Sequence, residues 1–468
     1  MIPFAVSAFN GSGDAIAFAV SAAVGILVSA ALFFLGRKAD LSRMGTAGAY
    51  ASVSLSWIAA SAISALPYFI YGAAPTFTDA FFESISGYTT TGGTVFSNLE
   101  ILPRSIIIWR AITHWLGGLG IIGFTLALMP LVGARSFLIF RAESTGITHD
   151  KMTPRIRQTA IYLWLIYVSL TLALAVLLMG GGMSFFDAIC HGMSTIATGG
   201  FSTRSESIAY YHSPYIEWVI IIFMFLSGAN FVLHFYALKG GSVRHYLTDP
   251  EFKFYAVSVS ALSLLVSADL FTGGFGSLTA SIRAGFFQIT CFVTTTGFVA
   301  NNYDIWPHFS KSALFICMFL GGCAGSTAGG IKQARLLVML NSVRQRFRQM
   351  LNPKAVVILP IASHTLNPEV ILSCMAFFGL YLMVFVAGSF ALSLFESDMI
   401  TAISGAASAI GNVGTAFGRL GAADNFAAQA PGAKWILSFL MLCGRLELFT
   451  VFSLFSKIFR REQILKGE

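Results

Sequence analysis

Long apolar stretches alternate with short polar connections along most of this chain. Each stretch has about 20 residues, which is the length that an α-helix needs to cross the hydrocarbon core of a bilayer. The pattern predicts an all-α polytopic membrane protein. The expected membrane spans begin near Ala15, Gly45, Ser105, Ile156, Pro214, Phe252, Ser312, Glu369 and Lys434.

Composition and charge agree with this interpretation. Of the 468 residues, 56% are hydrophobic and 11% are charged, whereas soluble domains carry roughly 25% charged residues. Most of the 29 Lys and Arg follow the first, third, fifth, seventh and last spans, so they gather on one side of the membrane. Because cytoplasmic loops collect positive charge, we interpret the net charge of +8 as topology rather than affinity for nucleic acid. It predicts an external N-terminus and a cytoplasmic C-terminus.

Cysteine usage and loop length argue against catalytic chemistry. The six cysteines are scattered through apolar surroundings without a C-x-x-C pair, so neither a disulfide framework nor a zinc site is indicated. The polar connections are too short to fold as a separate catalytic domain. We find no converging nucleophile, base or metal ligands, and we expect neither an enzyme nor a cofactor bound to this chain.

One supersecondary pattern returns four times. In each copy a span ends, a cap residue starts an apolar segment too short to cross a bilayer, and a polar loop containing glycine follows. Ser, Thr and Asp can satisfy the free N–H groups at a helix N-terminus, so each segment is predicted to be a re-entrant half-helix. The copies are TFTDAFFESISGYTTTGG with its cap at Thr78 or Asp79, MSFFDAICHGMSTIATGG with Ser184, SLTASIRAGFFQITCFVTTTGF with Ser277, and SDMITAISGAASAIGNVGT with Ser397 or Asp398.

Four such units around one axis would make a pore for cations. Irregular backbone at membrane depth is tolerated only where it lines a cavity or is buried in protein. Rings of backbone carbonyls can replace the water around a cation, and half-helices that enter from outside point their partially negative C-terminal ends at the cavity. A single Thr-Thr-Thr-Gly is also typical of a turn, and Gly-rich membrane segments also pack helices together. Four copies on the outer side favour the pore.

Motifs spread over nearly the whole chain carry a family resemblance. They are FFESISGYTTTGG, HWLGGLGIIGF, IATGGFST, DPEFKFY, TTTGF, GGCAGSTAGGIK, AKWIL and GRLELFT. With these motifs the chain resembles the Trk/Ktr/HKT superfamily of potassium transporters, and most closely the bacterial TrkH/TrkG membrane subunits. The resemblance implies four pore-loop repeats around one pseudo-fourfold pore in a single chain.

The resemblance also implies a potassium selectivity filter made of main-chain carbonyls. Glycine at the key position of all four loops resembles the potassium-selective members, whereas serine at the first would suggest sodium. The fourth copy, GNVG, departs most from Thr-Thr-Gly, so we expect a ring that is asymmetric on one side. The implied filter residues are Thr90, Thr91, Gly92, Ala197, Thr198, Gly199, Thr295, Thr296, Gly297, Asn412, Val413 and Gly414.

The repeats divide the chain into five parts. Members similar to TrkH usually carry two helices before the first repeat, whereas one span, residues 15–36, precedes it here. We expect either that the first helix is absent or that the true start lies upstream. The predicted parts are an extra N-terminal helix at 1–44 and pore-loop repeats at 45–150, 151–249, 250–352, which includes the gate segment, and 353–468.

A glycine-rich segment, GGCAGSTAGGIK at residues 321–332, interrupts the seventh span. It is not a Walker A loop, because Ile331 separates the last glycine from Lys332. The resemblance implies an intramembrane gate just below the filter, while a kink for tight packing is the alternative. The predicted gate residues are Gly321, Gly322, Gly325, Ser326, Thr327, Gly329, Gly330, Lys332 and Arg445.

Five polar side chains in apolar surroundings carry further hypotheses. Arg445, inside the last span, is expected near the gate segment as a tether for carbonyls or a carboxylate, because a charge at the bilayer centre costs at least ~3 kcal/mol. Snorkelling to the cytoplasmic edge is the alternative. Glu83 suits the dipole of the first half-helix or draws cations. Arg110 and His114 could brace a pore loop, and His191 is interpreted as a hydrogen-bonded packing residue.

Together these inferences predict potassium uptake across the cytoplasmic membrane of a bacterium, without covalent chemistry. The resemblance further implies a homodimer and a cytosolic TrkA-like regulatory ring with nucleotide sites for ATP/ADP or NAD, since this chain has no dinucleotide fingerprint of its own. The alternative function is a sodium-coupled symporter of organic solutes, in which broken helices bind substrate at the membrane midplane. Repeats that share one orientation favour the potassium pathway.

Overall fold

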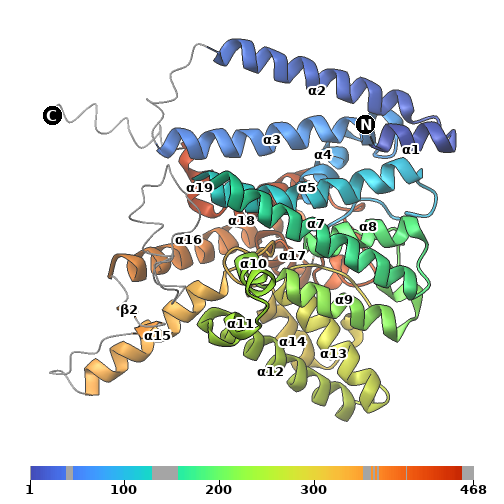
Figure 1. The fold of residues 1–468 in the computed structure, drawn as a ribbon. Helices are drawn as coiled ribbons and strands as arrows, with labels where there is room; N and C mark the ends of the chain where they lie inside the picture. The colour runs from blue at the N-terminus through green and yellow to red at the C-terminus, as the bar shows by residue number, and fades with distance from the viewer. Residues whose placement is uncertain are drawn as a thin grey trace, which may run out of the picture.

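The computed structural model describes residues 2–37, 46–128, 156–351, 360–361, 364–365, 368–396 and 398–455. Long helices run side by side along one common direction (Figure 1). Two short strands, β1 (Pro360–Ile361) and β2 (His364–Thr365), pair antiparallel with Pro360 opposite Thr365. Helices otherwise dominate, and the all-α class expected from the sequence is confirmed.

The outgoing helix of each repeat is long and apolar. Their exposed side chains are large and apolar, such as Phe390 on the last of them. Lipid tails are as apolar as these side chains, so such exposure costs little in a bilayer. An additional helix of the same kind precedes the first repeat. The five helices are α2 (Ala15–Gly36), α3 (Thr46–Tyr71), α7 (Ile156–Gly180), α12 (Pro250–Thr272) and α16 (Pro368–Leu392).

Most helices that return from the loops are broken. Within the described residues, five helices are long and apolar enough to span a membrane, or six if one bent pair counts as a span. The sequence predicted nine spans with a break in the seventh, which the structure has at that segment; the breaks in the fifth and ninth were not predicted. The returning helices are α5 (Arg104–Leu128), α9 (Pro214–Ser227) with α10 (Phe231–Gly240), α14 (His308–Cys317) with α15 (Gln333–Leu351), and α18 (Pro431–Arg445) with α19 (Leu448–Phe452).

The breaks in the returning helices arise from local residues, and the backbone groups that they free are hydrogen-bonded by distant parts of the chain. Between α9 and α10 the chain turns by 97°, and Asn230 caps α10 by accepting from the Val232 N–H at 2.9 Å. The Gly228 carbonyl at this break accepts a hydrogen bond from the Cys323 N–H at 2.8 Å. The last span breaks at Glu447, whose φ is +60°. A backbone group freed at membrane depth needs such a partner.

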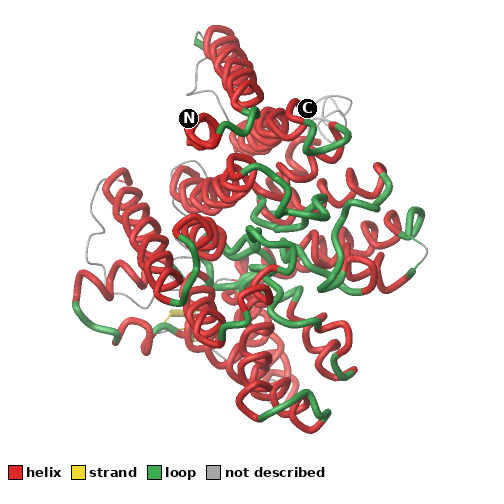
Figure 2. Tube along the Cα trace, turned by 90° about the vertical axis from the view of Figure 1, so that its right-hand side faces the viewer, coloured by secondary structure: helices red, strands yellow, loops and turns green. Residues whose placement is uncertain are grey.

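Four short helices lie inside the bundle between the long ones. They are α4 (Phe77–Tyr88), α8 (Phe185–Ile196), α13 (Leu278–Val293) and α17 (Met399–Gly411). Figure 2, which looks along the long helices, shows loop segments gathered centrally among surrounding helices. The remaining elements are α1 (Ile2–Asn10), α11 (Arg244–Thr248) and the 3₁₀ helices η2 (Ser207–Tyr211), η3 (Tyr303–Ile305), η4 (Gly418–Leu420) and η5 (Ser453–Phe455).

Two large apolar clusters support these inner helices. One joins the second and third repeats and contains the fully buried rings of Tyr167, Phe287 and Phe292. The other joins the first and fourth repeats around Phe82 and Leu437. Close packing, rather than transfer from water, holds helices together in lipid. The half-helices are therefore held on both sides by rigid packing, which fixes the loops at their ends.

Candidate functional site

Three of the four half-helices begin at residues that the sequence indicated. A serine side chain caps the second and third, and an aspartate carboxylate caps the fourth. Each accepts a backbone N–H of the first turn, which satisfies a donor that the helix itself leaves free. Ser397, the other candidate for the fourth cap, lies outside the described residues. The caps are Ser184, Ser277 and Asp398.

The first half-helix is capped two residues earlier than expected. Its N-cap is Thr76, not Thr78 or Asp79. The Thr76 hydroxyl accepts from the Asp79 N–H at 3.2 Å and donates to the Asp79 carboxylate at 2.7 Å. In a capping box the side chain at the third helical position accepts from the backbone N–H of the N-cap, whereas here the Asp79 carboxylate accepts from the Thr76 hydroxyl.

The four loops after the half-helices share one backbone conformation. In each loop a residue with φ between +50° and +56° is followed, two positions later, by a glycine with φ between +79° and +95°. The residue between them donates its N–H to a carbonyl five residues upstream at 2.8–2.9 Å. We call the twelve residues the ring. They are Thr90, Thr91 and Gly92, Thr198, Gly199 and Gly200, Thr295, Thr296 and Gly297, and Asn412, Val413 and Gly414.

This geometry shifts the second loop by one residue. The sequence analysis placed Ala197, Thr198 and Gly199 in the filter. The residue that matches Gly92 in φ and position is Gly200, whose φ is +83°. Ala197 is instead the C-cap of α8. The letters ATGG allow either alignment, because two successive glycines follow the threonine, and only the backbone conformation distinguishes them.

The four loops close on one another around a single axis. A Cβ added to Gly92 would overlap the carbonyl oxygen of Gly199 in the next repeat, and the same holds around the circle. Every such overlap lies below 3.0 Å, a separation that Cβ atoms essentially never show. Glycine is thus required by the neighbouring loop as well as by its φ. The remaining overlaps are Gly200 with Thr296, Gly297 with Val413, and Gly414 with Thr91.

Within the described part of the chain, the carbonyl oxygens of the ring have no hydrogen-bond donor. Among the residues that the structure describes, none donates a hydrogen bond to these twelve oxygens. Buried carbonyls are otherwise nearly always paired, so the ring is suited to water or a cation. No group of three or more His, Cys, Asp or Glu comes together elsewhere in the described chain. The ring carbonyls are therefore its candidate cation ligands.

The fourth loop keeps the ring conformation despite its different sequence. Asn412 takes the positive φ that threonine has in the other loops, and asparagine tolerates this region better than most residues. Its side-chain Nδ2 donates to the Thr91 hydroxyl at 3.0 Å and to the Met441 carbonyl at 2.8 Å. The asymmetry expected from GNVG is thus present in the side chains, while the backbone repeats the conformation of the other three loops.

Polar side chains from the half-helices hold the chain just beyond each of the first three loops. Glu83 accepts from the Val95 N–H at 2.9 Å. His191 contacts the Ser202 hydroxyl at 3.0 Å through Nε2, and Gln288 donates to the Phe298 carbonyl at 3.3 Å. His191 is buried and hydrogen-bonded on both ring nitrogens, as the packing interpretation requires.

The glycine-rich segment lies directly beneath the ring. We call residues 321–332 the gate loop. Its Thr327 hydroxyl donates to the carbonyl of Ile196, the last residue of α8, at 2.9 Å. Its Gly329 N–H donates to the Thr295 hydroxyl at 2.7 Å, and a Cβ on Gly329 would overlap the Gly411 carbonyl. The gate loop therefore touches the C-terminal ends of three half-helices.

Arg445 joins the gate loop to the first repeat. Its Nη1 donates to the Thr327 carbonyl at 2.6 Å and its Nη2 to the Gly117 carbonyl at 3.1 Å. The side chain is buried, so it does not snorkel to the cytoplasmic edge. Lys332 donates to the carbonyl of Ala328 within the gate loop. Two cations thus bind carbonyls below the ring.

Residues 15–466 match the TrkH family, described as a cation transport protein. The chain belongs to this family. It is 38% identical over 466 residues to the Trk system potassium uptake protein TrkH of Escherichia coli K12, covering 99% of this chain and 96% of that protein. It is 32% identical to TrkG of the same organism, over 98% and 94% of the two chains. These relatives are transporters and not enzymes, as the sequence predicted.

A solved TrkH structure has the same fold. The crystal structure of the potassium transporter TrkH from Vibrio parahaemolyticus superposes with a TM-score of 0.88 at 34% identity, over 97% of this chain and 94% of that one. The similarity to the TrkH/TrkG membrane subunits, first seen in short motifs, therefore extends over almost the whole chain.

Two features of this TrkH-family chain escaped the sequence analysis. The break between α9 and α10 follows Ser-Gly-Ala-Asn, where a glycine precedes an asparagine cap, and this signal could have been found. Glu251, in the first turn of α12, accepts from the Ala324 N–H at 2.5 Å and the Ala334 N–H at 3.0 Å. It belongs to the motif DPEFKFY, in which the sequence analysis assigned no role to this carboxylate. Glu251 holds the gate loop near both of its ends.

Proposed function

We propose that this protein takes up potassium across the bacterial cytoplasmic membrane through the ring. The single observation that carries the proposal is the closed circle of four loops whose main-chain carbonyls have no protein partner in the described chain. Such carbonyls can replace the water around a monovalent cation. The potassium-uptake function of the related TrkH and TrkG proteins supports potassium as that ion.

The proposed filter contains the twelve ring residues, with Gly200 in place of Ala197. Ions enter from the side of the half-helix N-termini, lose water in the ring, pass the gate loop and leave to the cytosol. The membrane potential contributes about 2.3 kcal/mol per charge per 100 mV. The gate loop closes this path from below, with Arg445 as its tether.

The proposal includes the assembly that the family suggests. It comprises a homodimer, a cytoplasmic C-terminus, as the distribution of Lys and Arg predicts, and a TrkA-like nucleotide-binding regulator that docks on the basic cytosolic face. The helix that follows the gate loop, α15, carries Arg344, Arg346 and Arg348 toward its end. A partner that moves α15 would also move the gate loop, because the two are continuous in the chain.

Complementation tests the function. A bacterium without its own potassium uptake systems should grow at low potassium when it carries the wild-type gene. Replacing Gly92 with serine adds a side chain at φ +88° against the Gly199 carbonyl, so we expect Gly92→Ser to transport with reduced preference for potassium over sodium. Absence of growth with well-expressed wild-type protein, together with no rubidium flux in vesicles, would refute the proposal.

A further inference from the structure

A buried ion pair lies behind the first and second loops of the ring. Arg110 of α5 donates from Nε to a carboxylate oxygen of Glu83 of α4 at 2.7 Å, and the two side chains are 1% and 0% exposed. Two charges removed from water in this way are costly unless further hydrogen bonds satisfy them. The remaining hydrogen bonds of the pair go to the segments that follow the first and second loops.

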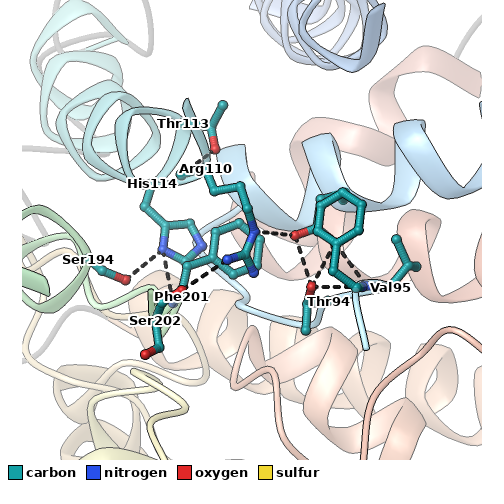
Figure 3. Close-up of polar contacts among 10 residues, drawn as sticks. Thr94, Val95, Arg110, Thr113, His114, Ser194, Phe201 and Ser202 are labelled. Atoms are coloured by element: carbon teal, nitrogen blue, oxygen red, sulfur yellow. Dashed lines mark hydrogen bonds and ion pairs between the residues drawn. The ribbon is translucent and has the colours of Figure 1, made fainter. Parts of the chain in front are cut away.

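Glu83 holds the first loop. Its carboxylate accepts from the Val95 N–H at 2.9 Å and from the Thr94 hydroxyl at 3.0 Å. These two residues come directly after the ring glycine Gly92 and its neighbour Gly93. In Figure 3, Thr94 and Val95 lie on one side of Arg110. The carboxylate thus fixes the direction in which the first loop leaves the ring.

Arg110 holds the second loop. Its Nη1 donates to the Ser202 carbonyl at 3.0 Å, two residues after Gly200. The guanidinium lies over the Phe201 ring at 4.0 Å from its centroid, and His114 stacks on the same ring at 4.0 Å. Figure 3 shows Arg110 between these residues and Thr94. Arg110 therefore reaches from one repeat into the next.

The equivalent positions in other repeats make a simpler contact. His191 and Gln288 occupy the place of Glu83 in the second and third half-helices, and each contacts the segment beyond its own loop. Neither needs a counter-charge to do so. In the first repeat the Glu83 carboxylate is paired with Arg110 of α5, which also bonds to the Ser202 carbonyl of the second repeat. Since Arg110 neutralises Glu83 at close range, Glu83 is poorly placed to draw cations as a free charge.

We propose that Glu83 and Arg110 are a positioning pair that sets the spacing between the first and second loops and thereby the preference for potassium over sodium. This inference rests on the proposed function. Discrimination by carbonyl oxygens depends on where the oxygens are held or how freely they move. A planar guanidinium, which binds a carboxylate and a carbonyl at fixed angles, supplies this constraint, whereas an ammonium does not.

The test compares conservative variants in purified full-length protein reconstituted into vesicles. Arg110→Lys keeps the charge beside Glu83 but loses the fork that also reaches Ser202. Thr94→Val, at nearly constant volume, removes the hydroxyl donor to Glu83 together with the acceptor of the Phe96 N–H. The measurement is rubidium uptake in competition with potassium or with sodium. Because one hydrogen bond to a charged group changes an equilibrium about tenfold or more, the potassium-to-sodium ratio should fall about tenfold in Arg110→Lys and less in Thr94→Val.

A second buried ion pair provides the matched control. Lys434 donates to the Asp79 carboxylate at 2.5 Å in the first turn of the same half-helix, with side chains 5% and 9% exposed. Among the described residues, the Lys434 ammonium bonds to Asp79 and to the Ala427 carbonyl, and neither of these is a ring residue. Asp79→Asn should lower the unfolding temperature without changing the ion preference. This comparison separates positioning from a general loss of stability.

The outcomes are distinguishable. Folded Arg110→Lys that keeps the wild-type ion preference would overturn the positioning role, as would an equal loss of preference in Asp79→Asn. A rise in apparent cation affinity in Arg110→Lys would instead indicate that Glu83 attracts ions. If Arg110→Lys does not insert, an unchanged ratio in Thr94→Val overturns the inference. Failure of the wild-type protein to carry rubidium would refute the proposed function itself.

Discussion

The clearest test of the ring is a methyl group at Gly200. Its φ is +83°, a conformation that costs an L-residue roughly 1–2 kcal/mol. The added carbon would also overlap the Thr296 carbonyl oxygen of the third loop. The added carbon would lie 2.0 Å from that oxygen, whereas an ordinary carbon–oxygen contact is about 3.3 Å, so the oxygen would have to move by about 1.3 Å. We expect Gly200→Ala to lose most of its preference for potassium over sodium.

Gly199→Ala is the informative comparison, because its conflict is with a side chain. Gly199 has no positive φ, and an added Cβ would overlap the His114 ring. Removing that ring in the double variant Gly199→Ala with His114→Ala should restore part of the lost function. In Gly200→Ala the added Cβ overlaps a backbone carbonyl, that of Thr296, which the removal of a side chain does not displace. His114→Ala should therefore not restore the function of Gly200→Ala.

Rubidium uptake into vesicles, with potassium or sodium as competitor, measures both effects. His114→Ala alone is the reference for the two double variants, and thermal unfolding in detergent reports whether each protein is folded. Suppose that Gly200→Ala kept the wild-type ion preference, and that Gly199→Ala lost it and His114→Ala did not restore it. The second loop would then have the alignment that begins at Ala197. The ring geometry argued from φ would then be refuted.

Contacts below and beside the ring give three further tests. Arg445→Met removes the hydrogen bond to the Thr327 carbonyl. A hydrogen bond to a charged group contributes about 1.5–3 kcal/mol, so rubidium uptake measured without the TrkA-like regulator should rise about tenfold or more. Unchanged uptake would contradict a tether. Glu251→Leu removes the acceptor of one backbone amide in the gate loop and of one in α15, so hydrogen exchange at these amides should accelerate. An exchange rate equal to that of the wild type would show that Glu251 does not hold the gate loop. Asp79→Asn leaves Lys434 without its buried counter-charge, so we expect a cost of about 3–5 kcal/mol, seen as a lower unfolding temperature; wild-type thermal stability would show the pair to be dispensable.

The sequence by itself determined the class, the repeats and most half-helix boundaries. Apolar length distinguishes a spanning helix from a half-helix such as α8 or α17, and this signal is local. The caps Ser184 and Asp398 are local too, because a cap bonds to N–H groups within three residues of itself. The interruption at residues 321–332 was visible because so many glycines in one span cannot support a continuous helix.

Only the tertiary structure decided the alignment of the ring and the partners behind it. Whether Ala197 or Gly200 belongs to the second loop depends on a carbonyl of the third loop, almost a hundred positions away. At the break between α9 and α10, the Gly228 carbonyl accepts a hydrogen bond from the Cys323 N–H, and Arg110 donates to the Ser202 carbonyl in another repeat. Backbone groups at membrane depth must find partners wherever the fold provides them, and no local pattern of residues encodes which distant atom that will be.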